Sequence, residues 1–214
     1  MSTDLPPVRA EHWETIYRER SSDELSWSQS EPATSLQLID EIGLDTEKAV
    51  VDVGAGESAL VDALLARGHR RVTVLDLSLQ ALARARARLD GAPGAAAVEW
   101  VVHDVLTWTP GTTFGLWHDR AVFHFLTEPA DRRAYVDTAA RAVAPEGFLI
   151  VATFSLDGPE KCSGLPVQRY DAAALAEQFA PSFTPVTAHT QTHRTPWDAV
   201  QPFTWLALRR RSER

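Results

Sequence analysis

The sequence predicts an α/β fold, a doubly wound sheet of seven strands that is mostly parallel and ends in an antiparallel C-terminal strand. Three observations predict it. Short apolar runs alternate with helix-like segments from residue 49 onward, the pattern of a parallel sheet covered by helices on both faces. The run at 147–154 is almost continuously apolar, as in a parallel strand buried on both faces. Residues 183–191 and 202–209 resemble two closing strands that form an antiparallel pair.

The remaining elements follow from hydrophobic periodicity and from the residues that end each segment. Residues 9–20 are predicted to form an amphipathic helix, and residues 33–42 a second helix that Gly43 ends. Further helices are predicted at 60–65, 79–90, 131–143 and 171–180, with strands at 49–51, 72–75, 98–102 and 114–119. We divide the chain into an N-terminal helical cover, residues 1–44, and one globular unit, residues 45–214.

Composition narrows the class of protein. The chain has 214 residues, of which 44% are hydrophobic and 23% charged, as in a soluble globular domain. A net charge of −8 argues against a nucleic-acid partner, because neutralising phosphates requires a basic surface. No apolar run reaches the ~20 residues of a membrane span, and residues 1–10 lack the apolar core of a signal peptide. A single cysteine excludes an internal disulfide framework, so we expect a cytoplasmic protein without a membrane partner.

One segment has the pattern of a nucleotide-binding unit. Asp52-Val53-Gly54-Ala55-Gly56 follows a short apolar run and precedes a helix-like segment. Asp76 ends the next apolar run, twenty residues past Gly56. A strand, a glycine turn, a helix, a second strand and an acid, in this order, predict a βαβ unit that binds a nucleotide.

Two cofactor classes fit these glycines. Gly54, Gly56 and Ala59 match the dinucleotide fingerprint, in which the helix N-terminus holds a pyrophosphate. Asp52 and Glu57 would repel a pyrophosphate, whereas a carboxylate at the strand end attracts the ammonium and sulfonium groups of S-adenosylmethionine. We therefore expect S-adenosylmethionine as the cofactor and retain a nicotinamide dinucleotide as the more distant alternative.

The order of these motifs resembles class I S-adenosylmethionine-dependent methyltransferases, which have a Rossmann-like fold, over roughly residues 45–210. The resemblance implies that the segment from Asp52 to Gly56 wraps the methionine part and that Asp76 binds the ribose. It further implies that Asp104 lies near the adenine amino group and that Val105 offers a backbone N–H to the ring. The cofactor-binding residues that we expect are Trp27, Asp52, Gly54, Ala55, Gly56, Asp76, Leu77, His103, Asp104, Val105 and Asp119.

Shorter stretches resemble narrower groups. His118-Asp119-Arg120-Ala121 is similar to the Asp-Arg-Gly-Ala element of the thiopurine S-methyltransferase and tellurite-resistance branch, which implies that Arg120 is an active-site residue. In this chain Ala121 replaces the glycine. The segment Gly54-Ala55-Gly56-Glu57-Ser58 instead resembles the first motif of lysine methyltransferases that act on elongation factor or citrate synthase. The whole chain looks most like an uncharacterised bacterial set whose signature is the segment at residues 157–170.

The expected reaction is a methyl transfer in which the protein aligns the acceptor, the methyl carbon and the leaving sulfur. A thiolate acceptor needs little help from a base. His124, just past the fourth strand, is the best candidate for a general base, and a packed histidine between two phenylalanines is the alternative. His118 is expected in a supporting role. No metal is expected, because His189 and His193 lack an accompanying cysteine pair or carboxylate cluster.

The acceptor site is predicted in residues 155–170, a segment long enough to form a lid after the fifth strand. Cys162 is expected as a wall of the pocket. Arg169 and Tyr170 are expected to clamp an anionic acceptor, unless Arg169 pairs with a nearby acid.

Aromatic residues that precede the first strand bear on the type of acceptor. Trp13, Tyr17 and Trp27 are expected either to close over the cofactor or to pack a helix on the sheet. A cover at both ends of the chain favours a small-molecule acceptor with a sulfur or another soft nucleophile. A protein lysine methyltransferase and a non-catalytic protein that binds S-adenosylmethionine stay open as alternatives, and the sequence leaves the oligomeric state undetermined.

Overall fold

The computed structural model describes residues 7–212. Residues 1–6, which belong to the predicted N-terminal cover and to the stretch inspected for a signal peptide, lie outside the described residues, as do residues 213–214. In the part of the chain that is described, every helix is too short or too polar to cross a membrane.

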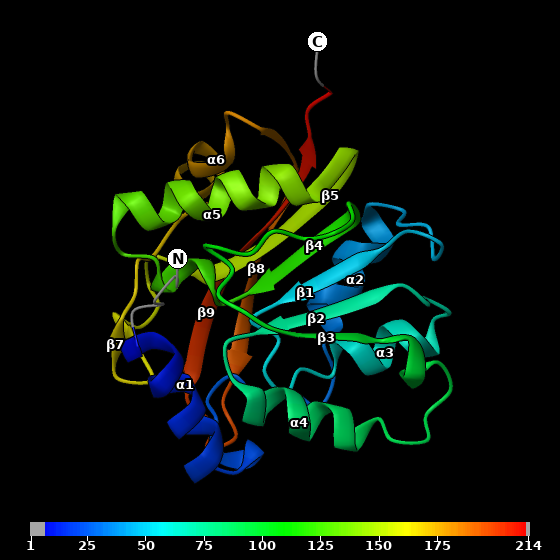
Figure 1. Cartoon of the computed structure of the whole chain (residues 1–214). Coiled ribbons are helices and arrows are strands. Elements are labelled where there is room, and N and C mark those ends of the chain that lie inside the picture. Colours follow the sequence, from blue (N-terminus) through cyan, green and yellow to red (C-terminus); the bar gives the residue numbers. More distant parts are fainter. Residues whose placement is uncertain (1–6, 213–214) are drawn as a thin grey trace.

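A seven-stranded sheet in the order β3-β2-β1-β4-β5-β9-β8 forms the centre of the molecule (Figure 1). Its strands are β1 (Val50–Val53), β2 (Val72–Asp76), β3 (Glu99–Val102), β4 (Phe114–Arg120), β5 (Val143–Phe154), β8 (Phe183–Arg194) and β9 (Val200–Arg210). Strands β1 to β5 pair in parallel, and β9 runs antiparallel to both β5 and β8. The predicted α/β fold, Rossmann-like and doubly wound with an antiparallel C-terminal strand, is confirmed.

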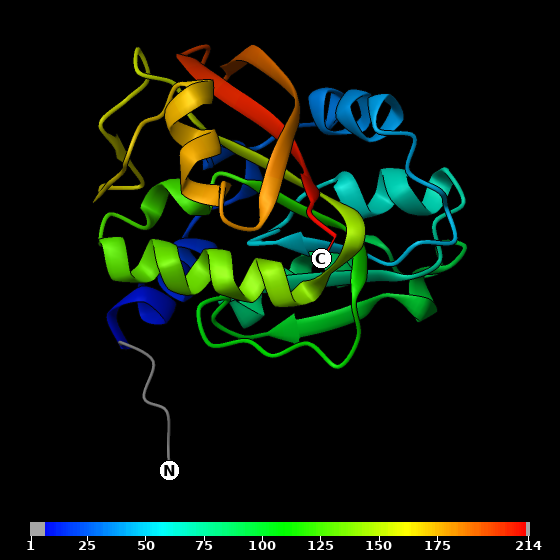
Figure 2. The same ribbon diagram turned by 90° about the horizontal axis from the view of Figure 1, so that it is seen from above.

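Helices cover both faces of this sheet (Figure 2). Helices α5 (Pro129–Ala142) and α6 (Ala172–Phe179) pack on one face, in a core that includes Trp117, Tyr135 and Phe179. Helices α2 (Ala33–Glu41), α3 (Leu60–Ala66) and α4 (Leu79–Arg88) pack on the other face, around Leu38, Leu64 and the strand residues that point toward them. All four residues of β1 are buried, as expected for a central parallel strand with helices on both sides.

Helix α1 (Pro7–Glu19) lies across the carboxyl ends of the parallel strands instead of along a face (Figure 1). Ile16 and Tyr17 pack against Leu25 and against Ala81 of α4. A 3-10 turn, η1 (Ser22–Glu24), follows α1. Because ligands of open α/β sheets bind at the carboxyl ends of the strands, α1 covers the place where a ligand is expected.

The boundaries differ from prediction mainly in the second half of the chain. Helix α5 passes directly into β5, which begins at Val143, four residues before the predicted start. Glu146 adopts a positive φ of 63°, and a Cβ at Gly147 would lie 2.9 Å from the carbonyl oxygen of Ala144, so this bend requires a glycine. Strands β8 and β9 extend the predicted hairpin toward its tip. The long segment after β5 contains a small hairpin, β6 (Lys161–Cys162) and β7 (Leu165–Pro166). Two further 3-10 turns are η2 (Ala95–Ala97) and η3 (Phe123–Phe125).

Candidate active site

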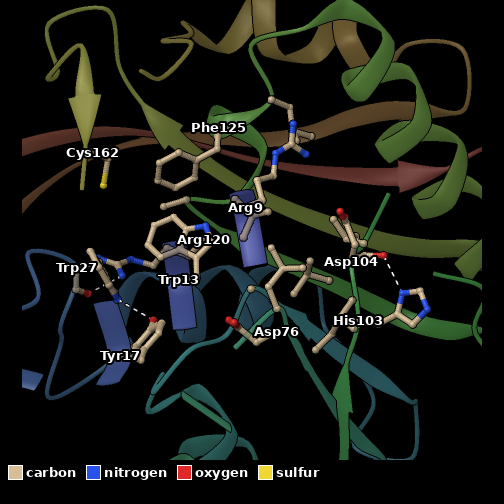
Figure 3. Close-up of a pocket in the computed structure, with 18 residues that line it drawn as sticks. Arg9, Trp13, Tyr17, Trp27, Asp76, His103, Asp104, Arg120, Phe125 and Cys162 are labelled. Carbon is tan, nitrogen blue, oxygen red and sulfur yellow. Dashed lines mark hydrogen bonds between the residues drawn. The ribbon is translucent and has the colours of Figure 1, made fainter. Parts of the chain in front are cut away.

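A cavity of about 110 Å³ lies between α1 and the carboxyl ends of the strands (Figure 3). Figure 3 shows Arg9, Trp13 and Tyr17 reaching it from α1, and Asp76 reaching it from the end of β2. A neighbouring cavity of about 290 Å³ shares Trp27, Val53, Gly54 and Arg120 with the first. The two cavities together follow the glycine turn after β1.

The glycine turn brings the backbone close to its neighbours. Gly54 and Gly56 have positive φ angles of 59° and 54°. A Cβ at Gly54 would lie 2.0 Å from Cγ2 of Val122, and a Cβ at Gly56 would lie 2.0 Å from the hydroxyl of Tyr17. Both the left-handed conformation and the lack of space therefore require glycine at these positions.

Asp76 connects the glycine turn to β2. Its Oδ2 accepts a hydrogen bond from the backbone N–H of Gly56 at 2.8 Å, and its Oδ1 accepts one from Ser78 N–H at 2.8 Å. Burial raises the pKa of Asp76 to about 6, against the opposing effect of these backbone hydrogen bonds. The carboxylate is thus fixed in the cavity wall and retains lone pairs for ligand hydroxyls.

Residues after β2 and β3 complete this side of the cavity. Leu77, His103, Asp104 and Val105 all line it. Asp104 Oδ1 accepts a hydrogen bond from Leu106 N–H at 2.8 Å, and the Nδ1 of His103 lies 3.0 Å from the carbonyl oxygen of Asp104 (Figure 3). The structure thus brings Asp76 and this group together, although they belong to different strand ends.

Aromatic side chains from the N-terminal segment form the opposite wall. The indole N–H of Trp27 donates to the hydroxyl of Tyr17 at 3.2 Å, and the ring of Trp13 lies edge-on to Trp27 and to Phe125. Burial raises the pKa of Tyr17 well above its usual value, so its hydroxyl stays protonated. Of the two alternatives for these residues, their positions match closure over the site.

Arg120 is a half-buried cation that lines both cavities, and its Nε and Nη2 atoms are fully buried. Its Nη1 donates to the carbonyl oxygen of Trp27 at 2.8 Å, and its guanidinium lies 5.3 Å from the centroid of the Phe203 ring. Among the described residues, its Nε and Nη2 find no hydrogen-bond partner. Burial lowers the pKa of Arg120 to about 10, which leaves it charged at neutral pH. A buried guanidinium with unused donors is suited to an anion.

Asp52 lines the larger cavity together with Ala55 and His118. Its Oδ1 lies 2.7 Å from the Nδ1 of His118. In the portion of the chain that is described, its Oδ2 is buried without a partner. This free carboxylate oxygen beside the glycine turn is the feature expected for a cationic ligand group.

Asp119 and His124 lie outside both cavity linings. Asp119 is buried and accepts hydrogen bonds from Val122 N–H at 2.8 Å, from Phe123 N–H at 3.0 Å and from the hydroxyl of Tyr135. It therefore shapes the turn after β4. His124 is 0% exposed, and its Nδ1 lies 3.4 Å from the backbone nitrogen of Phe154. Burial lowers the pKa of His124 to about 3, so its placement favours the packed-histidine alternative over a general base.

The three residues predicted for the acceptor site separate in the structure. Cys162 lines the smaller cavity, and burial raises the pKa of its thiol to about 11, as suits a pocket wall. Arg169 pairs with Glu160 at 3.1 Å, which matches the alternative of a nearby acid. Tyr170 packs beside Phe123 and, like Arg169, lies outside the linings of both cavities.

Several residues of the site escaped the sequence prediction. Arg9 lines the smaller cavity and pairs with Asp131 of α5. Ser35 lies 2.9 Å from the Nε2 of His118, and nothing in the sequence distinguishes this serine from any other on a helix. The contact between Asp52 and His118 was more accessible to prediction, because both lie at the ends of predicted parallel strands. In the structure the two residues are register partners on the adjacent strands β1 and β4. A search of the described residues finds no group of histidine, cysteine and acidic side chains that could hold a metal ion.

Comparisons with known proteins agree with this geometry. Residues 50–147 match the protein family described as methyltransferase domain. Thiocyanate methyltransferase 1 of Arabidopsis thaliana is 29% identical over 188 residues, which cover 86% of this chain and 78% of that protein. Thiocyanate methyltransferase 1 of Brassica oleracea is 31% identical over 133 residues, which cover 61% of this chain and 57% of that protein.

Solved structures share the fold. A structure described for the conversion of a disulfide bond into a thioacetal group during echinomycin biosynthesis has a TM-score of 0.75 and 23% identity, and the match covers 94% of this chain and 91% of that one. The N-methyltransferase NodS from Bradyrhizobium japonicum WM9, in complex with S-adenosylhomocysteine, has a TM-score of 0.71 and 16% identity, covering 94% and 99%.

Proposed function

Since the chain contains a class I S-adenosylmethionine-dependent methyltransferase domain, we propose that it transfers a methyl group to a small, soft nucleophile such as thiocyanate or a thiol. One observation carries the proposal. The cavity at the glycine turn is covered by α1 and lined by Arg120, whose buried Nε and Nη2 donors are unused.

The residues around the glycine turn fit the cofactor. The free Oδ2 of Asp52 suits the ammonium group, and Asp76 suits the ribose hydroxyls. His103, Asp104 and Val105 form the wall that suits the adenine. When it is bound, the cofactor supplies an electrophilic methyl group on a sulfonium, and the task of these residues is to hold and orient it.

The cover favours a small acceptor. Trp13, Tyr17 and Trp27 lie over the cavity, and Trp13 contacts Phe125 on the far side. A lysine on a protein surface would need an open acidic groove in order to reach the methyl group. The tight packing of α1 on the glycine turn therefore supports a small molecule over a protein acceptor.

The charges in the cavity favour an anionic acceptor that loses no proton. Methyl transfer to thiocyanate or a thiolate forms a new carbon–sulfur bond as the carbon–sulfur bond of the sulfonium breaks. No proton is released, so no general base is required. Arg120 supplies the positive charge that would attract such an anion out of water. His124, the base predicted from the sequence, is fully buried away from the cavity. Similarity to thiocyanate methyltransferases, which by name act on thiocyanate, supports the same class of acceptor.

The test is a comparison of acceptors with methyl-labelled S-adenosylmethionine. The purified protein is incubated with thiocyanate, a small thiol, a primary amine and a protein extract, and label is measured separately in small-molecule and protein fractions. We expect label on the sulfur nucleophiles alone. Label on the amine or on proteins would contradict the proposal. Heat stabilisation by S-adenosylhomocysteine without any transfer would indicate a non-catalytic binding protein, and stabilisation by NADH instead would indicate a dehydrogenase.

A further inference from the structure

Three buried polar side chains from three elements form a hydrogen-bonded chain behind the larger cavity. Asp52 belongs to β1, His118 to β4 and Ser35 to α2, and each is 2% exposed. The Nδ1 of His118 lies 2.7 Å from Asp52 Oδ1, and its Nε2 lies 2.9 Å from Ser35 Oγ. Polar groups this deeply buried are costly unless each proton and lone pair is used.

The three side chains differ in their access to the cavity. Asp52 and His118 line it, whereas Ser35 does not. The hydrogen bonds connect a serine, a histidine and an aspartate as in a hydrolytic triad. Ser35 is buried outside the cavity, however, and cannot contact a substrate. Ser35 can therefore affect the cavity only through His118.

The number of protons on each group determines which atom donates in each of these hydrogen bonds. An ionised aspartate can only accept, so the Nδ1 of His118 carries a proton and donates a hydrogen bond to Oδ1 of Asp52. If Nε2 accepts the hydroxyl proton of Ser35, every proton in the chain has a partner. If Nε2 carried a second proton, the hydroxyl proton of Ser35 would have no acceptor, because no other side-chain hydrogen bond of Ser35 occurs among residues 7–212. The chain is thus satisfied by a neutral histidine and an ionised aspartate.

This arrangement determines the charge beside the glycine turn. A neutral His118 leaves Asp52 with its full negative charge, whereas an imidazolium would cancel it. The remaining oxygen, Oδ2, has no partner in the described structure. An ionised carboxylate that is fixed through one oxygen and free at the other is preorganised for a cationic group.

We propose that Ser35 and His118 are positioning residues that hold Asp52 ionised, with Oδ2 free for the ammonium group of the bound methyl donor. The inference rests on the cofactor part of the proposed function and not on the acceptor. It predicts that loss of the Ser35 hydroxyl lowers the affinity only for those ligands that carry the ammonium group. A merely structural hydrogen-bond chain would affect all adenosine ligands alike.

The experiment measures ligand affinity of the full chain by calorimetry, without turnover. The two probes are S-adenosylhomocysteine and its deaminated analogue, which lacks only the ammonium group. Ser35→Ala is expected to weaken the binding of S-adenosylhomocysteine about tenfold, because the buried Nε2 of His118 loses its hydrogen-bond partner, and to change binding of the analogue less than twofold. Thr34→Ala is the matched control, because Thr34 lies on the same helix but is not part of the hydrogen-bonded chain. It should change neither affinity.

Two substitutions of His118 test whether a donor at the position of Nδ1 preserves cofactor binding. His118→Asn places a side-chain nitrogen two bonds from Cβ, as Nδ1 is, and keeps a donor for Asp52. His118→Gln places its nitrogen three bonds away, at the position of Nε2, and loses that donor. We expect His118→Asn to retain more S-adenosylhomocysteine affinity than His118→Gln, while the analogue binds both equally. His69→Asn, at a buried histidine of the α3–β2 turn, is the control for stability.

The outcomes separate the two proposals. If the wild-type protein binds neither probe, the proposed cofactor is wrong and this inference falls with it. If the wild-type protein binds S-adenosylhomocysteine but Ser35→Ala binds it equally well, only this inference is overturned. Equal weakening of both probes, in variants that unfold at the wild-type temperature, would also overturn it.

Discussion

The hydroxyl of Tyr17 fills the space where a side chain at Gly56 would begin, since a Cβ there would lie 2.0 Å from the Tyr17 oxygen. Tyr17 belongs to α1 and Gly56 to the glycine turn after β1, so α1 packs directly on that turn. The same hydroxyl accepts the indole N–H of Trp27. The position of α1 and the shape of the turn are therefore linked through one oxygen atom.

This contact predicts that Gly56→Ala destabilises the protein through two effects. A left-handed φ costs a residue with a Cβ about 1–2 kcal/mol, and overpacking against Tyr17 adds about 1–3 kcal/mol. Gly43→Ala is the matched control, because Gly43 has a similar φ of 62° and a Cβ added there would meet no atom within 4 Å. Unfolding in urea should show a larger loss of free energy for Gly56→Ala, and equal losses would contradict the contact.

Asp76 predicts a pH dependence of cofactor affinity. Its pKa is raised from 3.8 to about 6 in the fold, so ionised Asp76 costs stability above pH 6, and this cost is relieved as pH falls toward 3.8. Ribose hydroxyls donate to the ionised form. The affinity for S-adenosylhomocysteine should therefore fall as pH decreases through about 6, by up to about tenfold per pH unit.

Calorimetry between pH 5 and pH 8 measures this dependence. Asp76→Asn should bind more weakly and lose the pH dependence. Asp119 provides the control, since burial raises its pKa to about 6 as well, but it lies outside the cavity linings. Asp119→Asn should keep the wild-type pH dependence, and a flat wild-type profile would argue against Asp76 as the ribose acceptor.

The unused donors of Arg120 lead us to expect that its removal weakens the binding of an anionic acceptor. Arg120→Met should raise the KM for thiocyanate at least tenfold, because hydrogen bonds to charged groups contribute about 1.5–3 kcal/mol, while kcat changes less. Arg9→Met is the matched control. Arg9 lines the same cavity but is paired with Asp131, so its loss should affect the KM less. Steady-state kinetics with each variant would reject the assignment if both arginines had the same effect.

His124 predicts sensitivity of the fold to acid. Its pKa is lowered from 6.5 to about 3, so the neutral ring contributes stability that is present above pH 6.5 and lost as pH falls toward 3. His124→Leu should reduce the decline in unfolding free energy between pH 6.5 and pH 4.5. If methyl transfer is active, its pH–rate profile should keep its shape in this variant. Loss of the acidic limb, the fall in rate at low pH that a titrating base produces, would restore His124 as a general base.

The order of strands, helices and glycine turn was predictable because each depends on local pattern. Buried strands at β1, β2 and β5 are apolar runs, and positive φ angles at Gly54 and Gly56 allow only a narrow choice of residue. The start of β5 at Val143 was missed, because Pro145, Glu146 and Gly147 have the composition of a turn although they lie within the strand. The hairpin β6–β7 was missed because two-residue strands leave no periodic pattern.

By itself the sequence determined the class of fold, and it placed Asp52, Asp76 and Asp104 at or near the ends of strands, which parallel strands bring to one edge of the sheet. Only the tertiary structure decided where the residues predicted for the acceptor site and for the general base lie. It buried His124, paired Arg169 with Glu160 and left Arg120 with unused donors. It also joined Ser35 to His118 across two elements. Such contacts depend on how distant segments pack, and packing brings together residues whose separation along the chain carries no periodic signal.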